Sequence, residues 1–339
     1  MIQIQNEITQ QLGIRFPAIM APMFLVSNES MMKAAMRAGI MGTFPTLNYR
    51  KEGELAQVIE NLHTYKKDNN LVQGNFGVNL IVQKSNPLYE KHLKICADGK
   101  VPFYITSLGN PQAVVEAAHA YGAKVYSDVT NLKHAQIVYE KGCDGFIAVG
   151  QGAGGHAGPY PLHLLVPALR KQFPDKPVIA AGGIATGEST LSMLSLGAAA
   201  VSIGTRFIAS KEASVSQEYK DAIVKSHMDD IVMTTRLSGT PCTIINTPYA
   251  KKIGYEQNWL EKFLSTNATT KKYFKMLVQL RGFKKLEEAV KPGNYNNLWC
   301  AGQSVEMVKD IKSVEEIVNT LILETEEAYG RLQGIMASS

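Results

Sequence analysis

The stretch PVIAAGGIATGESTLSMLSLGAAAVSIGTRF, residues 177–207, contains two short apolar runs that each lead into glycine, with a helical pattern between them. The runs Pro177–Gly182 and Ala200–Phe207 are nearly continuous rather than alternating, which is typical of parallel strands buried on both faces. The segment between them ends at Gly197, a residue suited to a left-handed helix cap. The stretch therefore predicts a strand, a helix and a second strand parallel to the first.

The same unit recurs towards the N-terminus. Six more apolar runs are expected to be strands: Pro17–Ala21, Met41–Pro45, Gly74–Leu80, Phe103–Ser107, Lys124–Val129 and Gly145–Gly150. Helical periodicity is found at Glu29–Ala38, Glu52–Lys66, Pro111–Tyr121, Asn131–Lys141, Pro161–Gln172 and Gly187–Leu196. Eight alternating units favour either a closed barrel or a doubly wound sheet.

The position of the glycines separates these two folds. A dinucleotide-binding sheet should show G-x-G-x-x-G directly after its first strand, whereas the first strand here ends in Ala21-Pro22-Met23. The glycine clusters follow the sixth, seventh and eighth strands instead, as in a barrel with a phosphate site late in the chain. We therefore expect an α/β fold, a (β/α)₈ TIM barrel with a smaller, mostly helical cap region.

Beyond about residue 210 the βα pattern stops. We interpret the helical Ser214–Lys225 as the eighth barrel helix, the irregular Met233–Tyr249 and the basic stretch after it as a cap near the mouth, and the amphipathic Ser313–Leu332 as a closing helix. The predicted division is a barrel over residues 1–227, a helical cap or insertion over 228–297, and a C-terminal segment and helix over 298–339.

Composition limits the class of protein. Hydrophobic residues make up 45% of the chain and charged residues 19%, as in a globular protein. The N-terminus lacks the features of a signal peptide, and no stretch approaches 18 uninterrupted apolar residues, so we expect a cytoplasmic protein without a membrane segment. The four cysteines have no metal-ligand spacing, which favours buried free thiols and no metal site.

The net charge of +5 is unevenly distributed. Residues 250–292 contain ten Lys or Arg and four Glu, a balance of +6. A solvated helical surface explains this by default, and the alternative is a site for an anionic partner such as a 2′-phosphate or an acidic carrier protein. Nucleic acid is not expected, because no binding motif is present.

The loop after the sixth strand reads Gln151-Gly152-Ala153-Gly154-Gly155-His156-Ala157-Gly158. Small residues leave His156 little steric cover, and an imidazole can accept or donate a proton near neutral pH. A histidine is more often a surface or core residue, and we give that interpretation to the other six. Because His156 stands on a glycine-rich loop at a barrel strand end, we expect it to be catalytic.

Other strand ends offer binding groups. Glycines at Gly182-Gly183 and at Gly204 before Thr205 let the backbone approach a phosphate, although ordinary tight turns would look the same. Ala21, Pro22, Met23, Asn79 and Asp128 follow or end earlier strands and could supply the apolar backbone and polar groups that a flat ring needs. Asp128 could instead be only a helix N-cap.

With these residues in view, the sequence resembles the nitronate monooxygenase family, formerly called 2-nitropropane dioxygenases, which are FMN-dependent barrels. The resemblance covers nearly the whole chain, and its AGGHAG element, residues 153–158, is the most specific part. The other shared stretches are PAIMAPM (17–23), GVNL (77–80), SDVTNLKHA (127–135), PVIAAGGIATG (177–187), SIGTRFIASKEA (202–213) and LWCAGQS (298–304).

The resemblance implies an FMN site and a reaction. FMN would be held by the backbone around Pro22 and Met23, by Asn79, and by Gly155, Gly182, Gly183, Gly204 and Thr205. His156 matches the family's base, which deprotonates a nitroalkane or orients its nitronate. The flavin takes an electron, and O₂ completes the conversion to a carbonyl compound and nitrite.

Asp128 departs from the family, where some relatives have Lys or a neutral residue at that strand end. Enoyl-acyl-carrier-protein reductases and NAD(P)H:quinone reductases carry the same glycine-flanked histidine. An NAD(P)H-dependent FMN reductase is therefore the alternative function, and the basic 250–292 segment favours it. A non-catalytic flavin-binding role is the third hypothesis, and the C-terminal helix could serve a homodimer.

Overall fold

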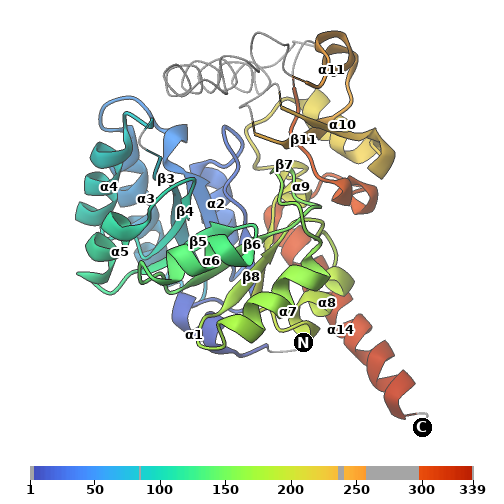
Figure 1. Cartoon of the computed structure of the whole chain (residues 1–339), viewed down its shortest axis with the longest axis horizontal. Coiled ribbons are helices and arrows are strands. Elements are labelled where there is room, and N and C mark those ends of the chain that lie inside the picture. Colours follow the sequence, from blue (N-terminus) through green and yellow to red (C-terminus); the bar gives the residue numbers. More distant parts are fainter. Residues whose placement is uncertain (1–3, 84, 236–239, 257–297, 338–339) are drawn as a thin grey trace.

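The computed structural model describes residues 4–83, 85–235, 240–256 and 298–337. At its centre is a closed parallel barrel with the strand order β1-β2-β3-β4-β5-β6-β8-β9, so the predicted (β/α)₈ barrel is confirmed (Figure 1). The barrel strands are β1 Ala18–Met20, β2 Met41–Pro45, β3 Asn75–Ile81, β4 Phe103–Ser107, β5 Lys124–Val129, β6 Gly145–Val149, β8 Val178–Ala181 and β9 Ala200–Ile203.

Helices surround the barrel and cover the outer faces of its strands. They pack on the outward side chains through one large apolar cluster. The helices between strands are α2 Glu29–Arg37, α3 Glu54–Asp68, α4 Tyr89–Asp98, α5 Gln112–His119, α6 Leu132–Tyr139, α7 Leu162–Gln172 and α8 Gly187–Ser195.

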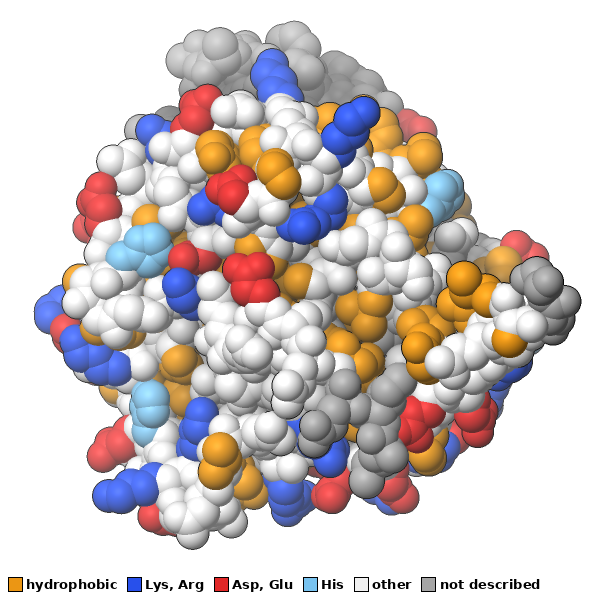
Figure 2. Space-filling model, turned by 90° about the horizontal axis from the view of Figure 1, so that it is seen from below, with side chains coloured by type: hydrophobic (Ala, Val, Ile, Leu, Met, Phe, Trp, Pro, Cys, Tyr) orange, Lys and Arg blue, Asp and Glu red, His pale blue; other side chains and the backbone are white. Residues whose placement is uncertain are grey.

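The N-terminal end of the barrel is closed by α1, Glu7–Leu12, which the sequence analysis did not predict. Ile8 and Leu12 join the apolar side chains inside the barrel, and Tyr126 donates a hydrogen bond to Gln11 at 2.7 Å. Figure 2 views this end, where Lys and Arg side chains lie among Asp and Glu rather than in a patch of one sign. The site residues predicted from the sequence lie at the opposite end, where the strands finish.

The eighth barrel helix is α14, Val314–Ala337, and the prediction that Ser214–Lys225 takes this place was wrong. α14 packs against both α8 and α2, which closes the ring of helices (Figure 1). α10, Gln217–Lys225, packs instead on α9, Thr205–Ile208, and on η3, Gln303–Met307. Periodicity shows that a helix has an apolar face but not which groove receives it, which explains the error.

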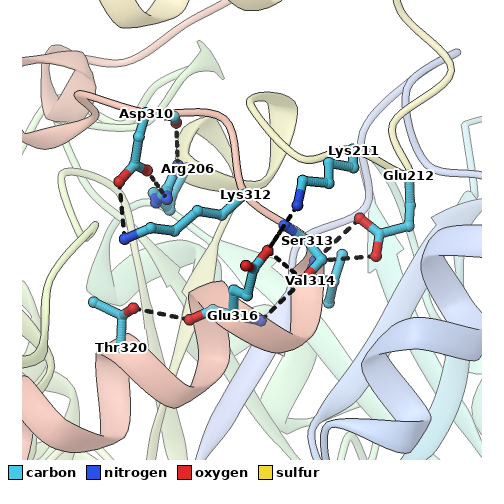
Figure 3. Close-up of polar contacts among 9 residues, drawn as sticks. All are labelled: Arg206, Lys211, Glu212, Asp310, Lys312, Ser313, Val314, Glu316 and Thr320. Atoms are coloured by element: carbon cyan, nitrogen blue, oxygen red, sulfur yellow. Dashed lines mark hydrogen bonds and ion pairs between the residues drawn. The ribbon is translucent and has the colours of Figure 1, made fainter.

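Ion pairs and hydrogen bonds fasten the start of α14 to the segment after β9 (Figure 3). Arg206, a nearly buried residue of α9, pairs with Asp310 at 2.5 Å between Nη2 and Oδ1, and its Nη1 donates to the Asp310 carbonyl oxygen at 2.9 Å. The Glu212 carboxylate accepts from the Val314 amide at 3.0 Å. The insertion between β9 and α14 therefore begins and ends at one place.

A small antiparallel sheet stands at the C-terminal ends of the barrel strands. β10, Ile231–Thr234, pairs with β11, Cys242–Ile245, and β11 pairs with β7, Gly155–His156. The prediction of irregular structure over Met233–Tyr249 was therefore wrong, because strands of two to four residues are too short to show a period. The described part of the predicted helical cap contains this hairpin and the helix α11, Pro248–Ile253.

The rest of the predicted cap, and the basic segment from residue 257 on, lie outside the described residues. Within the described ranges, no helix is both long and apolar enough to span a membrane.

Candidate functional site

Strand alternation decides which side chains line the mouth of the barrel. Ile105, Tyr126, Ile147 and Ile179 fill its interior. Because side chains alternate along a strand, the residue two positions later on each strand also points inward. These mouth positions are Ser107, Asp128, Val149 and Ala181, joined by Asn79, which pairs with Ile105. The mouth is thus polar along β3, β4 and β5 and apolar along β6 and β8.

A chain of hydrogen bonds joins the polar side of the mouth. The Asn79 amide donates to Ser107 Oγ at 2.7 Å, and Ser107 Oγ donates to Asp128 Oδ2 at 2.5 Å. Burial raises the pKa of Asp128 to about 6, and the Ser107 hydrogen bond opposes that rise. Asp128 is not a helix cap, because Asn131 caps α6 by accepting from the His134 amide. Its raised pKa places a carboxyl that exchanges its proton near neutrality at the mouth.

Replacing Asp128 with asparagine is expected to have a pH-dependent effect on stability. Relative to wild type, the free energy of unfolding of the variant should be about 2–3 kcal/mol higher at pH 8 than at pH 4. The carboxyl of the folded protein has a pKa of about 6 against 3.8 for a free side chain, so its favourable contribution exists when it is protonated and is lost as the pH rises through 6. Asparagine carries no such charge. Urea unfolding at both pH values measures the difference.

The matched control is Asp98→Asn, at an exposed position of α4. A stability difference for Asp128→Asn that stayed constant with pH would show that Asp128 is not desolvated in the folded protein.

The predicted phosphate loops come together on the other side of the mouth. Gly182 has φ +121°, and a Cβ there would lie 2.7 Å from the Ala153 amide nitrogen, so the loop after β8 touches the histidine loop directly. A Cβ on Gly204 would lie 3.7 Å from Ala21 Cβ and 3.9 Å from Met23 Sδ. A cavity of about 290 Å³ opens here, lined by Gly152, Gly182, Gly183, Ile184, Ser189 and Gln303 among others.

Thr205 lies where three segments meet. Its buried hydroxyl accepts a hydrogen bond from the Gly302 amide at 3.0 Å, and a Cβ on Gly154 would lie 2.7 Å from that same amide nitrogen. The C-terminal segment around residues 298–304 thus supports the site, a role the sequence analysis did not assign to it. Pro22 is partly buried beside Ala21 and Met23.

His156 is held by the small sheet. It pairs with Cys242 of β11, while Gly155 pairs with Thr243, whose hydroxyl donates to the Ala153 carbonyl at 2.7 Å. The His156 side chain keeps an exposed surface, yet the protein atoms around it desolvate the imidazole enough to lower its pKa. Both observations fit a side chain in a hollow that opens to solvent. The imidazole is therefore neutral at pH 7 and able to accept a proton.

Thr46 is a buried polar residue near the mouth that the sequence analysis did not single out. It follows β2 directly, is fully buried, and its hydroxyl has no hydrogen-bond partner among the described residues. The preceding residue, Pro45, pairs with Asn79, so Thr46 adjoins the polar side of the mouth. The hydroxyl is closed off from solvent, so it is not among the groups that face the open mouth. The signal in the sequence was a polar residue directly after an apolar strand.

Comparison with known proteins places the chain in a family. Residues 47–324 match one family profile, that of nitronate monooxygenase. The chain belongs to the nitronate monooxygenase family. Its members are flavin-dependent oxidoreductases, and this protein is an enzyme of that class.

Individual relatives of the family match most of the chain. A probable nitronate monooxygenase of Staphylococcus saprophyticus is 26% identical over 97% of this chain and 100% of that protein. The (3aS,4S,5R,7aS)-5-hydroxy-7a-methyl-1-oxo-octahydro-1H-indene-4-carboxyl-CoA dehydrogenase of Rhodococcus jostii is 27% identical over 76% of this chain and 70% of that protein.

Solved structures of the family's fold superpose on nearly the whole chain. FabK from Thermotoga maritima has a TM-score of 0.82 and 30% identity, and the match covers 98% of this chain and 99% of that one. The nitroalkane oxidase from Streptomyces ansochromogenes has a TM-score of 0.79 over 96% of this chain and all of that one, and at 22% identity it shares the fold.

Proposed function

We propose that this nitronate monooxygenase family member binds FMN at the barrel mouth and uses O₂ to oxidise alkyl nitronates, or the nitroalkanes that give rise to them, to carbonyl compounds and nitrite. The observation that carries the proposal is His156, a neutral imidazole held at the mouth by the β7–β11 pairing. It stands at the same end of the barrel as the glycine loops.

The residues at the mouth fit a flavin mononucleotide. Gly182 and Gly183 border the cavity, which suits a phosphate because glycine permits close approach of backbone amides, and Gly204 and Thr205 follow the neighbouring strand β9. Ala21, Pro22 and Met23 offer an apolar surface for the ring, and Asn79, Asp128 and Gly155 offer polar groups. When bound, the flavin supplies the electron acceptor.

The chain's own residues perform the proton chemistry. The unprotonated nitrogen of His156 takes the proton from the carbon that bears the nitro group, and the resulting imidazolium faces the nitronate anion that forms. The Asn79–Ser107–Asp128 chain holds the polar side of the mouth in a fixed orientation. β11 of the hairpin β10–β11 pairs with β7, and this pairing fixes the position of His156 relative to the barrel.

Mixing the purified, flavin-loaded protein anaerobically with propyl-2-nitronate is expected to change the flavin absorbance, whereas NADPH alone leaves it unchanged. Stopped-flow spectroscopy measures both reactions on one preparation. Rapid bleaching by NADPH, with no response to the nitronate, would contradict the proposal.

That contrary result would favour an NAD(P)H-dependent FMN reductase acting on an enoyl thioester or a quinone. One similarity supports this second candidate. The Rhodococcus relative is named as the dehydrogenase of a carboxyl-CoA compound, which is a thioester. Adding an enoyl-CoA or a quinone after reduction by NADPH shows which of these two compounds reoxidises the flavin.

A further inference from the structure

Two cysteines that are far apart in the sequence meet beside His156. Cys242 Sγ of β11 lies 3.9 Å from Cys300 Sγ. The prediction of buried free thiols is confirmed for Cys96, Cys143 and Cys242, whereas Cys300 is free but only partly buried, and Cys242 and Cys300 are neighbours. Cys242 is buried, whereas Cys300 is partly exposed. The pair thus combines one accessible thiol with one protected thiol.

The edge of β11 places this thiol pair next to the histidine. Cys242 pairs with His156, and Ile244, two residues along β11, forms an antiparallel bridge with Cys300. Residues paired across antiparallel strands point to the same face of a sheet, as do residues two apart on one strand. Cys242, Cys300 and His156 therefore share one face of the sheet.

We propose that Cys242 and Cys300 form a reversible disulfide when the protein is exposed to a peroxide, and that this bond changes the position in which β11 holds His156. This goes beyond the oxidoreductase activity proposed above. The thiolate of Cys300 attacks one oxygen of H₂O₂, the O–O bond breaks, and a sulfenic acid and water form. The Cys242 thiol then attacks that sulfur and releases the second water. Two thiols lose two electrons and two protons, and one peroxide becomes two waters.

The environment of each thiol fixes the order of these steps. Cys300 is the more accessible partner and meets the peroxide first. The hydrogen bond to Cys300, together with burial, raises the pKa of Cys242, which keeps Cys242 a thiol until the neighbouring sulfur has been oxidised. A small dithiol such as dithiothreitol reverses the bond by exchange.

Bond formation must bring the two sulfurs together beside the site. A disulfide bond is about 2.05 Å long, so the two sulfurs must close nearly half of their present separation. On one side, β11 carries the pairing that holds His156. On the other, the Cys300 carbonyl accepts from the Tyr219 hydroxyl at 2.5 Å, and Gly302 bonds to Thr205. The disulfide would therefore link the strand that holds the base to the segment that bonds the loop after β9.

Titration with H₂O₂, followed by intact-mass measurement and thiol counting, tests the inference. The wild-type protein and the control Cys143→Ser, whose thiol is buried in the barrel wall, are expected to lose two hydrogens and two free thiols, and dithiothreitol should restore both. Cys242→Ser and Cys300→Ser should form no intramolecular bond. Neither readout needs flavin or substrate, so the proposed activity can fail while this inference stands.

Oxygen adducts on wild-type Cys300 without a cross-link would overturn the proposal, as would a bond that joins two chains. Peptide mapping of the oxidised wild-type protein locates the 242–300 bond directly, even if a serine variant folds poorly.

A second readout is turnover. The turnover of the oxidised wild-type enzyme should differ several-fold from that of the reduced wild-type enzyme, whereas oxidation should not change the turnover of the Cys242→Ser variant in this way. Equal turnover of oxidised and reduced wild-type protein would refute the effect on His156.

Discussion

Replacing His156 with alanine is expected to lower kcat for nitroalkane oxidation by a factor of about 10²–10⁴ while the flavin stays bound. The side chain is exposed at the mouth, and its lowered pKa leaves the imidazole unprotonated at neutral pH. Its removal takes away the proton acceptor, but the glycine loops that are proposed to hold the cofactor are untouched. Steady-state kinetics and the flavin spectrum of the purified variant measure the two effects separately.

The pH profile distinguishes a base from a structural histidine. A base must be unprotonated, so wild-type kcat/KM should fall on the acid side, with a midpoint below the usual pKa of histidine because desolvation lowers that of His156. The variant should lack this limb. His119→Ala, an exposed histidine paired with Asp144, is the control. Full turnover by His156→Ala would revive the hypothesis that the bound flavin serves a role without this base.

Replacing Gly187 with alanine is expected to destabilise the protein by about 3 kcal/mol. A Cβ at this first residue of α8 would overlap the backbone of Thr325 and the side chain of Glu324 on α14. The Gly187 amide also donates to Glu324 Oε2 at 2.7 Å, so the two helices cannot separate without losing that bond. Chemical unfolding monitored by circular dichroism gives the free energy.

Gly330→Ala on the same helix pair is the matched control. A Cβ on Gly330 meets no atom within 4 Å, and alanine favours a helix over glycine, so this variant should gain about 0.5–1 kcal/mol. Equal effects of the two substitutions would contradict the assignment of α14 as the eighth barrel helix.

The barrel could be predicted because its signals are local. A strand covered on both faces is mostly apolar rather than alternating, and the runs predicted at Met41–Pro45, Phe103–Ser107 and Lys124–Val129 agree with β2, β4 and β5 residue for residue. The partner of α8 could not be predicted in this way. More than 130 residues separate Gly187 from Thr325, and only the closed fold brings them into contact.

The same distinction applies to the site. His156 and the glycines at 182–183 stand out because their own neighbours in the sequence mark them. The role of Ser107 could not be predicted, because it depends on the strand register that places this side chain between Asn79 and Asp128. Cys242 and Cys300 looked unrelated for the same reason, since a hairpin edge rather than a motif brings them together.

The late position of the eighth helix also matters during synthesis. Until α14 has left the ribosome, the flanks of α2 and α8 that it covers stay in water, although all eight strands have already been made. Contacts that close over such a long span form slowly, and exposed apolar seams invite association with other chains. Nascent protein that stalls anywhere between β9 and α14 is therefore a natural client for chaperones, and a premature stop there leaves a barrel with an open side.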